Sequence, residues 1–204
     1  MAENHRRVLV VDYDPSWPKV FEALRRPVWA AVRDVAVSVQ HVGSTAVPGL
    51  AAKPIIDMDV VLASSNNMSG AIERLATLGY VHRGNLGIED REAFGSPPGL
   101  PAHHLYVCPK GSAALANHLA LRDFLRRDSV AIAEYGRIKK QLAARYPDDI
   151  ESYIAGKTDF ILTVLRNAGF RDFRTADHQG RKPSFAKPVK RPTTSTAAMP
   201  TPPT

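Results

Sequence analysis

The sequence predicts an α+β fold, in which a small mixed β-sheet with flanking helices occupies the first half and a C-terminal helical cap the second. Three observations predict it. Residues 35–42 and 54–62 have strand-like patterns, and from residue 113 onward apolar residues recur at helical spacing. The length of 204 residues, with 44% hydrophobic content, suits one domain with a single core.

The chain is expected to begin with a strand and a helix. Residues 8–11 form a short apolar run, and Asp14-Pro15 then indicates a helix start with proline in its first position. Pro27 is expected to kink or divide this helix. The apolar positions of the helix are Trp17, Phe21, Leu24, Val28 and Val32.

Extended segments and one helix are expected to complete the first half. The extended segments are residues 35–42, 54–62, 91–94 and 103–107. A helix over residues 68–78 separates the second from the third, and Gly79 is expected to end it in a left-handed conformation. The turn-rich residues 95–99 join the last two extended segments.

Three helices are expected in the second half, where they form the cap. Their apolar positions are Leu115, Leu119, Phe124 and Leu125 in the first, Val130, Ala133, Ile138 and Leu142 in the second, and Ile154, Phe160, Ile161, Val164 and Leu165 in the third. Gly169 is expected to close the third helix.

The composition changes after Thr175, where bulky apolar residues become rare and six of the sixteen prolines fall between Pro183 and Pro203. Such a segment cannot bury enough apolar surface to offset its ordering entropy. We therefore expect one domain over residues 1–175 and a disordered, basic, Pro- and Thr-rich tail over residues 176–204. The tail carries +4 of the net charge of +7, and the remaining +3 suits small phosphate-bearing ligands as well as nucleic acid.

The sequence predicts a cytoplasmic protein without membrane contact. No stretch approaches the roughly 20 apolar residues of a membrane span, and no apolar signal-peptide core follows the polar residues 1–7. Cys108 is the only cysteine, which excludes an internal disulfide. Its apolar neighbours Leu105 and Val107 favour a buried, inert thiol.

Two acids interrupt the apolar run of residues 54–62. Because side chains alternate along a strand, Asp57 and Asp59 are expected to point to the same side. Two carboxylates held together repel each other unless a cation lies between them. Oxygen ligands of this kind suit Mg or Mn, which commonly bridge carboxylates to substrate phosphates.

A phosphate-binding turn precedes this acidic strand. In Gly43-Ser44, the absence of a glycine side chain allows backbone N–H groups and a hydroxyl to approach phosphate oxygens. Thr45 adds a second hydroxyl, for which a capping role is an equal alternative. Together with Asp57 and Asp59, the turn suits metal-assisted attack at the α-phosphorus of a nucleoside triphosphate, with pyrophosphate leaving.

The run HVGSTAVPGLAAKPIIDMDV, residues 41–60, resembles the signature of GrpB-like proteins, a branch of the nucleotidyltransferase superfamily. Further similar elements are YDPSW, GYVHRG, HLYV, LRDFLR and the pairs Tyr135 with Lys139 and Tyr153 with Lys157. The resemblance covers roughly residues 8–170. It implies a nucleotidyltransferase-like sheet, with Gly43 and Ser44 binding phosphate and Asp57 and Asp59 binding metal.

One departure from the superfamily pattern concerns a third carboxylate, which many of these enzymes carry on a later strand. Residues 103–107 contain no acid. His104 and Tyr106 share a face by alternation, so His104 is a candidate base or metal ligand, with a structural histidine as the equal alternative. His103, facing the other way, is expected to be structural. Acids that a nearby loop would offer instead are Glu89, Asp90 and Glu92.

Basic side chains are needed to neutralise a triphosphate. The candidates are Lys53, Arg83, Arg91, Arg122, Lys139 and Lys157. Each has the alternative of a solvated charge, and Tyr106 is a further candidate contact for the substrate.

These features lead to one principal function and two alternatives. The principal hypothesis is a metal-dependent nucleotidyltransferase that moves a nucleoside monophosphate from a nucleoside triphosphate to a small-molecule acceptor. The first alternative is a non-catalytic nucleotide- or cofactor-binding module, linked by domain fusions in the family to coenzyme A metabolism. The second, ranked last, is an RNA-directed enzyme that uses the basic tail. Nothing in the sequence selects a base, an acceptor or an oligomeric state.

Overall fold

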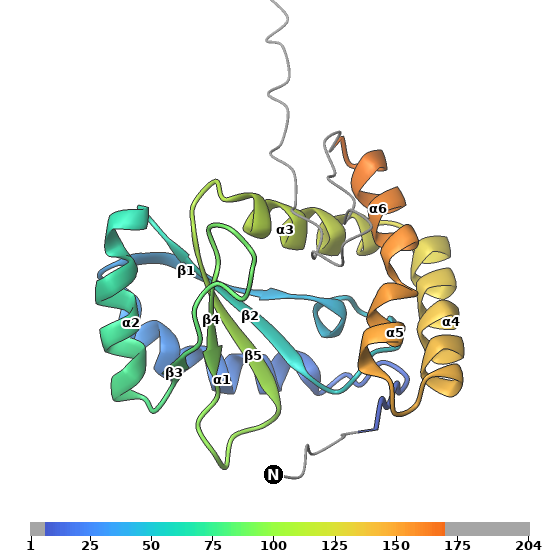
Figure 1. Ribbon diagram of the computed structural model, residues 1–204, viewed down its shortest axis with the longest axis horizontal. Coiled ribbons are helices and arrows are strands. Elements are labelled where there is room, and N and C mark those ends of the chain that lie inside the picture. The colour runs from blue at the N-terminus through green and yellow to red at the C-terminus, as the bar shows by residue number, and fades with distance from the viewer. Residues whose placement is uncertain (1–6, 170–204) are drawn as a thin grey trace, which may run out of the picture.

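A five-stranded mixed sheet forms the centre of the protein, as the computed structural model of residues 7–169 shows (Figure 1). Its order is β1-β2-β5-β4-β3, with bounds β1 (Ala36–Val42), β2 (Ile56–Leu62), β3 (Val81–His82), β4 (Glu92–Gly95) and β5 (His103–Pro109). Strands β2 and β5 are parallel, and the other neighbouring pairs are antiparallel. The predicted α+β class is confirmed, whereas the predicted tail lies outside the described residues.

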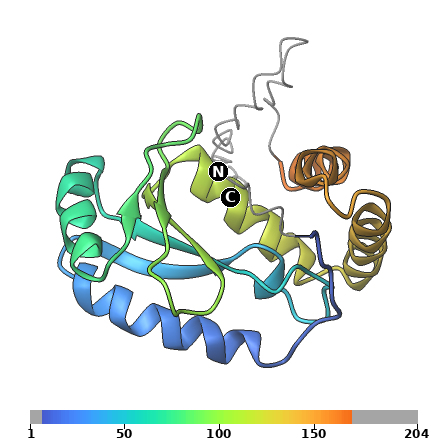
Figure 2. The same cartoon turned by 60° about the horizontal axis from the view of Figure 1, so that its bottom comes forward.

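Helices cover both faces of the sheet and one end of it. Figure 2 shows α1 (Trp17–Val32) below the sheet and α3 (Ala113–Leu125) above it. Helix α2 (Met68–Thr77) packs beside α1. The remaining helices form the C-terminal cap and are α4 (Ser129–Arg145), α5 (Ile150–Ala155) and α6 (Thr158–Asn167). None of the helices in this part of the chain has the length and apolar character that a membrane crossing requires.

Side-chain alternation divides the central strands between an apolar face and a polar face. Met58, Val60, Leu105 and Val107 are fully buried and belong to the main core, together with α1 and α2. The intervening residues of β2 and β5 lie on the face toward α3. Asp57 pairs in register with His104, and Asp59 with Tyr106.

The start of α1 differs from the expectation. The helix begins at Trp17 with Ser16 as its N-cap residue, because Asp14 Oδ1 accepts a hydrogen bond from the Ser16 N–H at 2.8 Å and forms a turn before the helix. Proline lies in the first turn of α1, as predicted, but it is Pro18. Pro27 does not divide the helix, since the buried face that includes Val28 holds both halves against the sheet.

Two other segments differ from the prediction. Residues 8–11 form no strand but only an isolated bridge between Val11 and Ala52. The third predicted helix is two helices, α5 and α6, which separate at Gly156. A Cβ added at Gly156 would collide with Cδ2 of Leu142 in α4, so a side chain there would need Leu142 to move. Gly79 ends α2 at φ +84°, as predicted.

Candidate active site

Two carboxylates of β2 form the centre of the polar face. Asp59 is fully buried, and its Oδ2 accepts a hydrogen bond from Nδ1 of His118 at 2.7 Å. Its second oxygen, Oδ1, has no hydrogen-bond partner among the described residues. Burial raises the pKa of Asp57. The charges of His104 and His118 oppose this change, and the carboxylate of Asp59 adds to it. The two acids therefore interact unfavourably unless a cation joins them.

The donor set fits a magnesium-like ion. The unpartnered oxygen of Asp59 and the proximity of Asp57 supply two carboxylates that a cation would satisfy. Within residues 7–169, no group of three His, Cys, Asp or Glu side chains lies close enough together to bind a metal ion without ligands from outside the protein. Mg²⁺ suits such an arrangement, because it keeps several waters and shares substrate phosphates beside one or two carboxylates.

Gly43 lies directly against the carboxylate of Asp57. Its backbone has φ +68° and ψ −168°, a region essentially restricted to glycine, and an added Cβ would collide with Oδ2 of Asp57. Ser44 follows at the start of a short 3-10 helix, η1 (Ser44–Ala46), and is partly exposed. The sequence-predicted turn and acidic pair are thus in contact.

Thr45 is used by the fold. Its buried hydroxyl hydrogen-bonds Nε2 of His41 at 3.0 Å and donates to the carbonyl of Ile55 at 3.4 Å. Burial and the charges of Arg126 and Arg122 lower the pKa of His41 to about 4, so this histidine is neutral. The hydroxyl of Thr45 therefore connects the Gly43-Ser44 turn to the segment before β2, and no side chain among the described residues forms a cap bond at η1.

Arg122 of α3 and Arg126, the C-cap residue of that helix, hold the backbone on either side of the turn. Nη1 of Arg122 donates to the carbonyl of His41 at 3.1 Å and to the side chain of Gln40 at 3.1 Å. Nε of Arg126 donates to the carbonyl of Ala46 at 2.9 Å. Arg122 therefore lies at the predicted site, but its hydrogen bonds position the turn. Arg126 has the same role, and the sequence analysis did not identify it.

Two predicted lysines, Lys53 and Lys157, lie near Asp57, and the third, Lys139, lies near Lys157. Lys53 and Lys157 both lie over the ring of Tyr153, at 5.8 Å and 4.4 Å from its centroid. Lys139 is buried at 2% exposure, with Nζ 4.4 Å from the centroid of the Tyr135 ring. That Nζ has no hydrogen-bond partner in the part of the chain that the structure describes. These lysines come from the loop before β2, from α4 and from the junction of α5 and α6.

The lysines are close enough to affect one another's protonation. Burial, with a smaller contribution from Lys157, lowers the pKa of Lys139 to about 7. Burial and the charge of Lys53 lower the pKa of Lys157 to about 8, while Asp57 opposes the change. Burial also lowers the pKa of Lys53, against the effect of Asp57. Such a cluster of partly dehydrated cations suits a polyanion.

A second group of residues surrounds Tyr106 on the same face. His104 is exposed beside Asp57, and its ring centroid lies 6.2 Å from that of Tyr106. His118 approaches Tyr106 from α3 with a centroid distance of 6.0 Å. Arg91 is buried, and its guanidinium carbon lies 4.3 Å from the centroid of the Tyr106 ring. His104, Tyr106 and Arg91 are therefore brought to the acidic pair, as predicted.

Other predicted residues lie away from the acidic pair. Arg83 is exposed and crosses Gly95 on the outer strands. Glu92 pairs with His82 at 2.7 Å, and therefore supplies no third carboxylate to the site. His103 is buried, with Nδ1 donating to the Pro101 carbonyl at 2.7 Å and Nε2 bonded to the Tyr80 hydroxyl at 2.8 Å.

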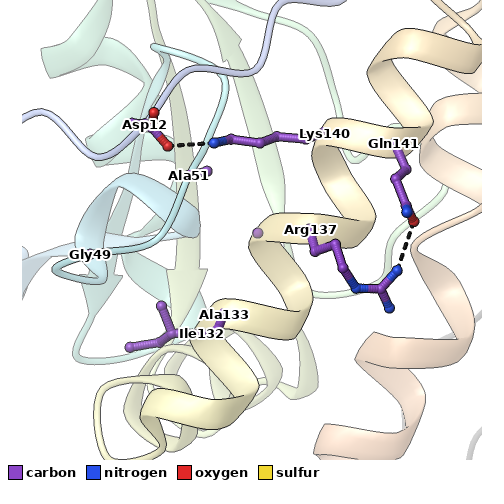
Figure 3. A pocket seen from close by; sticks show the side chains of 9 residues that line it. Asp12, Gly49, Ala51, Ile132, Ala133, Arg137, Lys140 and Gln141 are labelled. Atoms are coloured by element: carbon purple, nitrogen blue, oxygen red, sulfur yellow. Dashed lines mark hydrogen bonds and ion pairs between the residues drawn. The ribbon is translucent and has the colours of Figure 1, made fainter.

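Cys108 and a surface pocket are not part of the site. Burial raises the pKa of the Cys108 thiol well above its usual range, as an inert thiol requires. The pocket in Figure 3 has a volume of about 380 Å³ and lies between α4, the segment after η1 and Asp12. Its charged groups are satisfied by neighbours, since Lys140 pairs with Asp12 and Arg137 bonds Gln141.

His118 is the residue at the centre of the site that sequence reasoning missed. It lies in a continuous helical pattern, and no motif distinguishes it. The available signal is its position four residues before Arg122, which places both side chains on one face of α3. That face is the one directed toward β1 and β2.

The fold and these contacts define an α+β protein with a candidate site for a phosphorylated ligand and a divalent cation. The chain belongs to the GrpB family, whose sequence profile, described as GrpB protein, matches residues 7–167. It is similar to the crystal structure of conserved protein GrpB from Enterococcus faecalis, with 32% identity and a TM-score of 0.71. That similarity covers 78% of this chain and 96% of the other.

Two curated proteins extend the comparison. UPF0157 protein YqkA of Bacillus subtilis is 35% identical over 163 residues, which are 80% of this chain and 48% of that protein. A dephospho-CoA kinase of Mycolicibacterium paratuberculosis is 28% identical over 202 residues, covering 86% of this chain and 48% of that protein. This chain thus spans about half the length of both relatives.

Proposed function

We propose that this protein is a metal-dependent nucleotidyltransferase, which moves a nucleoside monophosphate from a nucleoside triphosphate to a small-molecule acceptor. The contact between Gly43 and Asp57 is the observation that carries the proposal, because it joins the phosphate-binding turn to the acidic pair. The unpartnered oxygen of Asp59 and the adjacent lysines support it.

The residues divide the work of the reaction among them. Asp57 and Asp59 would hold Mg²⁺ or Mn²⁺, which supplies charge neutralisation and polarisation of the α-phosphoryl group. Ser44 and the backbone of the turn bind phosphate oxygens, while the lysine cluster neutralises the rest of the triphosphate. An acceptor oxygen forms a bond to the α-phosphorus as the bond to the bridging oxygen breaks, and pyrophosphate leaves. His104, exposed beside Asp57, takes the acceptor's proton.

Pyrophosphate release tests this proposal. The wild-type chain is incubated with each common nucleoside triphosphate, Mg²⁺ or Mn²⁺ and a panel of small acceptors, and compared with Asp57→Asn and Asp59→Asn. Loss of a group that only orients a metal ligand already costs about 10–100-fold, so loss of a carboxylate ligand itself is expected to lower the rate by about 100-fold or more. Asp34→Asn is the matched control, because Asp34 is exposed and pairs with Arg74 on a distant helix. Full activity in both site variants would refute the metal assignment.

A non-catalytic nucleotide- or cofactor-binding module is the second candidate. The observation that favours it is the absence of an acid on the polar face of β5, where His104 and Tyr106 stand. The similarity to a dephospho-CoA kinase adds the expectation of a ligand related to coenzyme A. Saturable, Mg-dependent nucleotide binding without turnover of any acceptor would favour this function over transfer.

A further inference from the structure

A single arginine lies at the opposite end of the acidic pair from the lysines. Arg91 immediately precedes β4, in which Ala93 pairs with Tyr106, so alternation places Arg91 on the polar face. Its guanidinium carbon is 4.3 Å from the centroid of the Tyr106 ring. Tyr106 in turn is the register partner of Asp59. Arg91 therefore lies against Tyr106 on the face of the sheet that also carries Asp59.

The guanidinium of Arg91 forms no ion pair with a carboxylate in the described part of the chain. The side chain is 8% exposed, and its Nε forms no hydrogen bond within residues 7–169. Its acidic neighbours do not compensate, since Asp90 is exposed at a backbone φ of +56° and Glu92 pairs with His82. A buried N–H group without a hydrogen-bond partner is unfavourable, and an oxyanion supplied from outside the fold would satisfy Nε and pair with the charge.

The charges of the site are arranged in two separate groups. The charges of Lys53 and Lys157 act on Asp57, whereas the charge of Arg91 acts on Tyr106 and His118. Asp57 and Asp59 are about 7 Å apart along the strand, at roughly 3.3 Å per residue. A nucleotide whose phosphates occupy the lysine cluster thus leaves the guanidinium free for a second molecule.

We propose that Arg91 is the recognition site for an oxyanion, a phosphate or a carboxylate, on the acceptor. This inference rests on the proposed transferase function and narrows the acceptor to anionic molecules. The planar guanidinium binds either group through two parallel hydrogen bonds, and the Tyr106 ring holds its plane in place. The acceptor's nucleophilic oxygen would then lie toward Asp59 and the α-phosphorus.

Ligand-observed NMR with two small probes tests the site. The full chain is first saturated with Mg-tripolyphosphate, which occupies the lysine cluster, and methyl phosphate or acetate is then titrated at constant ionic strength. Wild type is expected to bind at least one probe, and the stronger probe identifies the class of anion. Arg91→Met is expected to weaken that binding at least tenfold. Arg91→Lys retains the charge but loses the paired hydrogen bonds, and should be intermediate.

The controls separate this inference from the proposed function. Arg25→Met removes an arginine from α1, on the other face of the sheet, and should bind the probes as wild type does. Thermal melting confirms that each variant is folded. Absence of probe binding in wild type, or equal binding in Arg91→Met, overturns the anion site. If Mg-tripolyphosphate does not bind while a probe binds through Arg91, the nucleotide proposal fails and the anion site stands.

Discussion

Replacement of Lys139 by methionine is expected to stabilise the ligand-free protein while weakening its binding of nucleotide. Methionine keeps the length and flexibility of the side chain but removes a buried amine that has no hydrogen-bond partner among residues 7–169. The same amine lies near Lys157, whose charge acts on Asp57, and it belongs to the lysine cluster proposed to bind the triphosphate. This one substitution therefore separates the effect of the buried charge on folding stability from its contribution to nucleotide binding.

The size of the stabilisation follows from the pKa of Lys139. Burial lowers this pKa from 10.5 to about 7, so at pH 7 Lys139 is protonated in a smaller fraction of folded molecules than of unfolded ones. That displacement corresponds to roughly 4 kcal/mol at pH 7, an upper limit for the gain from Lys139→Met. The unfolded chain binds more protons between pH 7 and 10.5, so wild-type stability from this group rises with pH. The advantage of the variant should therefore shrink, by roughly 1–2 kcal/mol between pH 7 and 8.5.

Denaturant unfolding of both proteins at pH 7.0 and 8.5 measures the effect, and calorimetric titration with Mg-nucleotide measures affinity. Lys140→Met is the matched control, since the neighbouring lysine is exposed and pairs with Asp12. It should change stability by less than about 1 kcal/mol. A destabilised Lys139→Met protein, or an advantage that does not change with pH, would show that Lys139 is not the dehydrated cation described above.

Three other substitutions test the contacts around the turn and Asp59. Gly43→Ala should destabilise the protein by about 1–3 kcal/mol in denaturant unfolding and abolish metal-dependent nucleotide binding, because the added Cβ displaces the Asp57 carboxylate. Gly49→Ala is the control, since its Cβ meets no described atom within 4 Å, and it should change stability but not nucleotide binding. His118→Gln should weaken Mg-nucleotide binding, measured by calorimetry, about 10–100-fold. His118→Asn places a donor near the position of Nδ1 and should retain more of the affinity. Equal losses of affinity in the two variants would refute the role of the 2.7 Å bond in orienting Asp59. Arg126→Met removes the hydrogen bond to the Ala46 carbonyl and should destabilise by about 1 kcal/mol in the same unfolding assay, so an unchanged midpoint would exclude it as a support of the turn.

The sequence predicted those parts of the site that depend on local geometry. The common face of Asp57 and Asp59 follows from the two-residue period of a strand, and β2 has that period throughout. The Gly43 turn was predictable for a similar reason, since its conformation requires glycine within one short segment. The expectation of a division of the helix at Pro27 was wrong, because burial of Val28 and its neighbours against the sheet holds α1 together through the proline.

Contacts between distant segments were beyond such rules. The bond between His118 and Asp59 joins residues 59 positions apart, and depends on how α3 lies across the sheet. The same docking determines that Arg122 bonds to backbone instead of remaining free for a ligand. Likewise, the burial of Lys139 depends on the packing of α4 against the rest of the chain, which helical periodicity alone does not specify.

The lysine cluster has a mechanical consequence, because its members belong to different parts of the fold. Lys53 is attached to the sheet, whereas Lys139 and Lys157 belong to the cap. Repulsion between Lys53 and Lys157 therefore acts between the sheet and the cap, and opposes their contact in the absence of an anion. A polyphosphate bound between these lysines would replace their repulsion by attraction to a shared anion, and would hold the sheet and the cap together. The ligand would then link the cap to the sheet as well as serve as a substrate, and its binding would stabilise the cap.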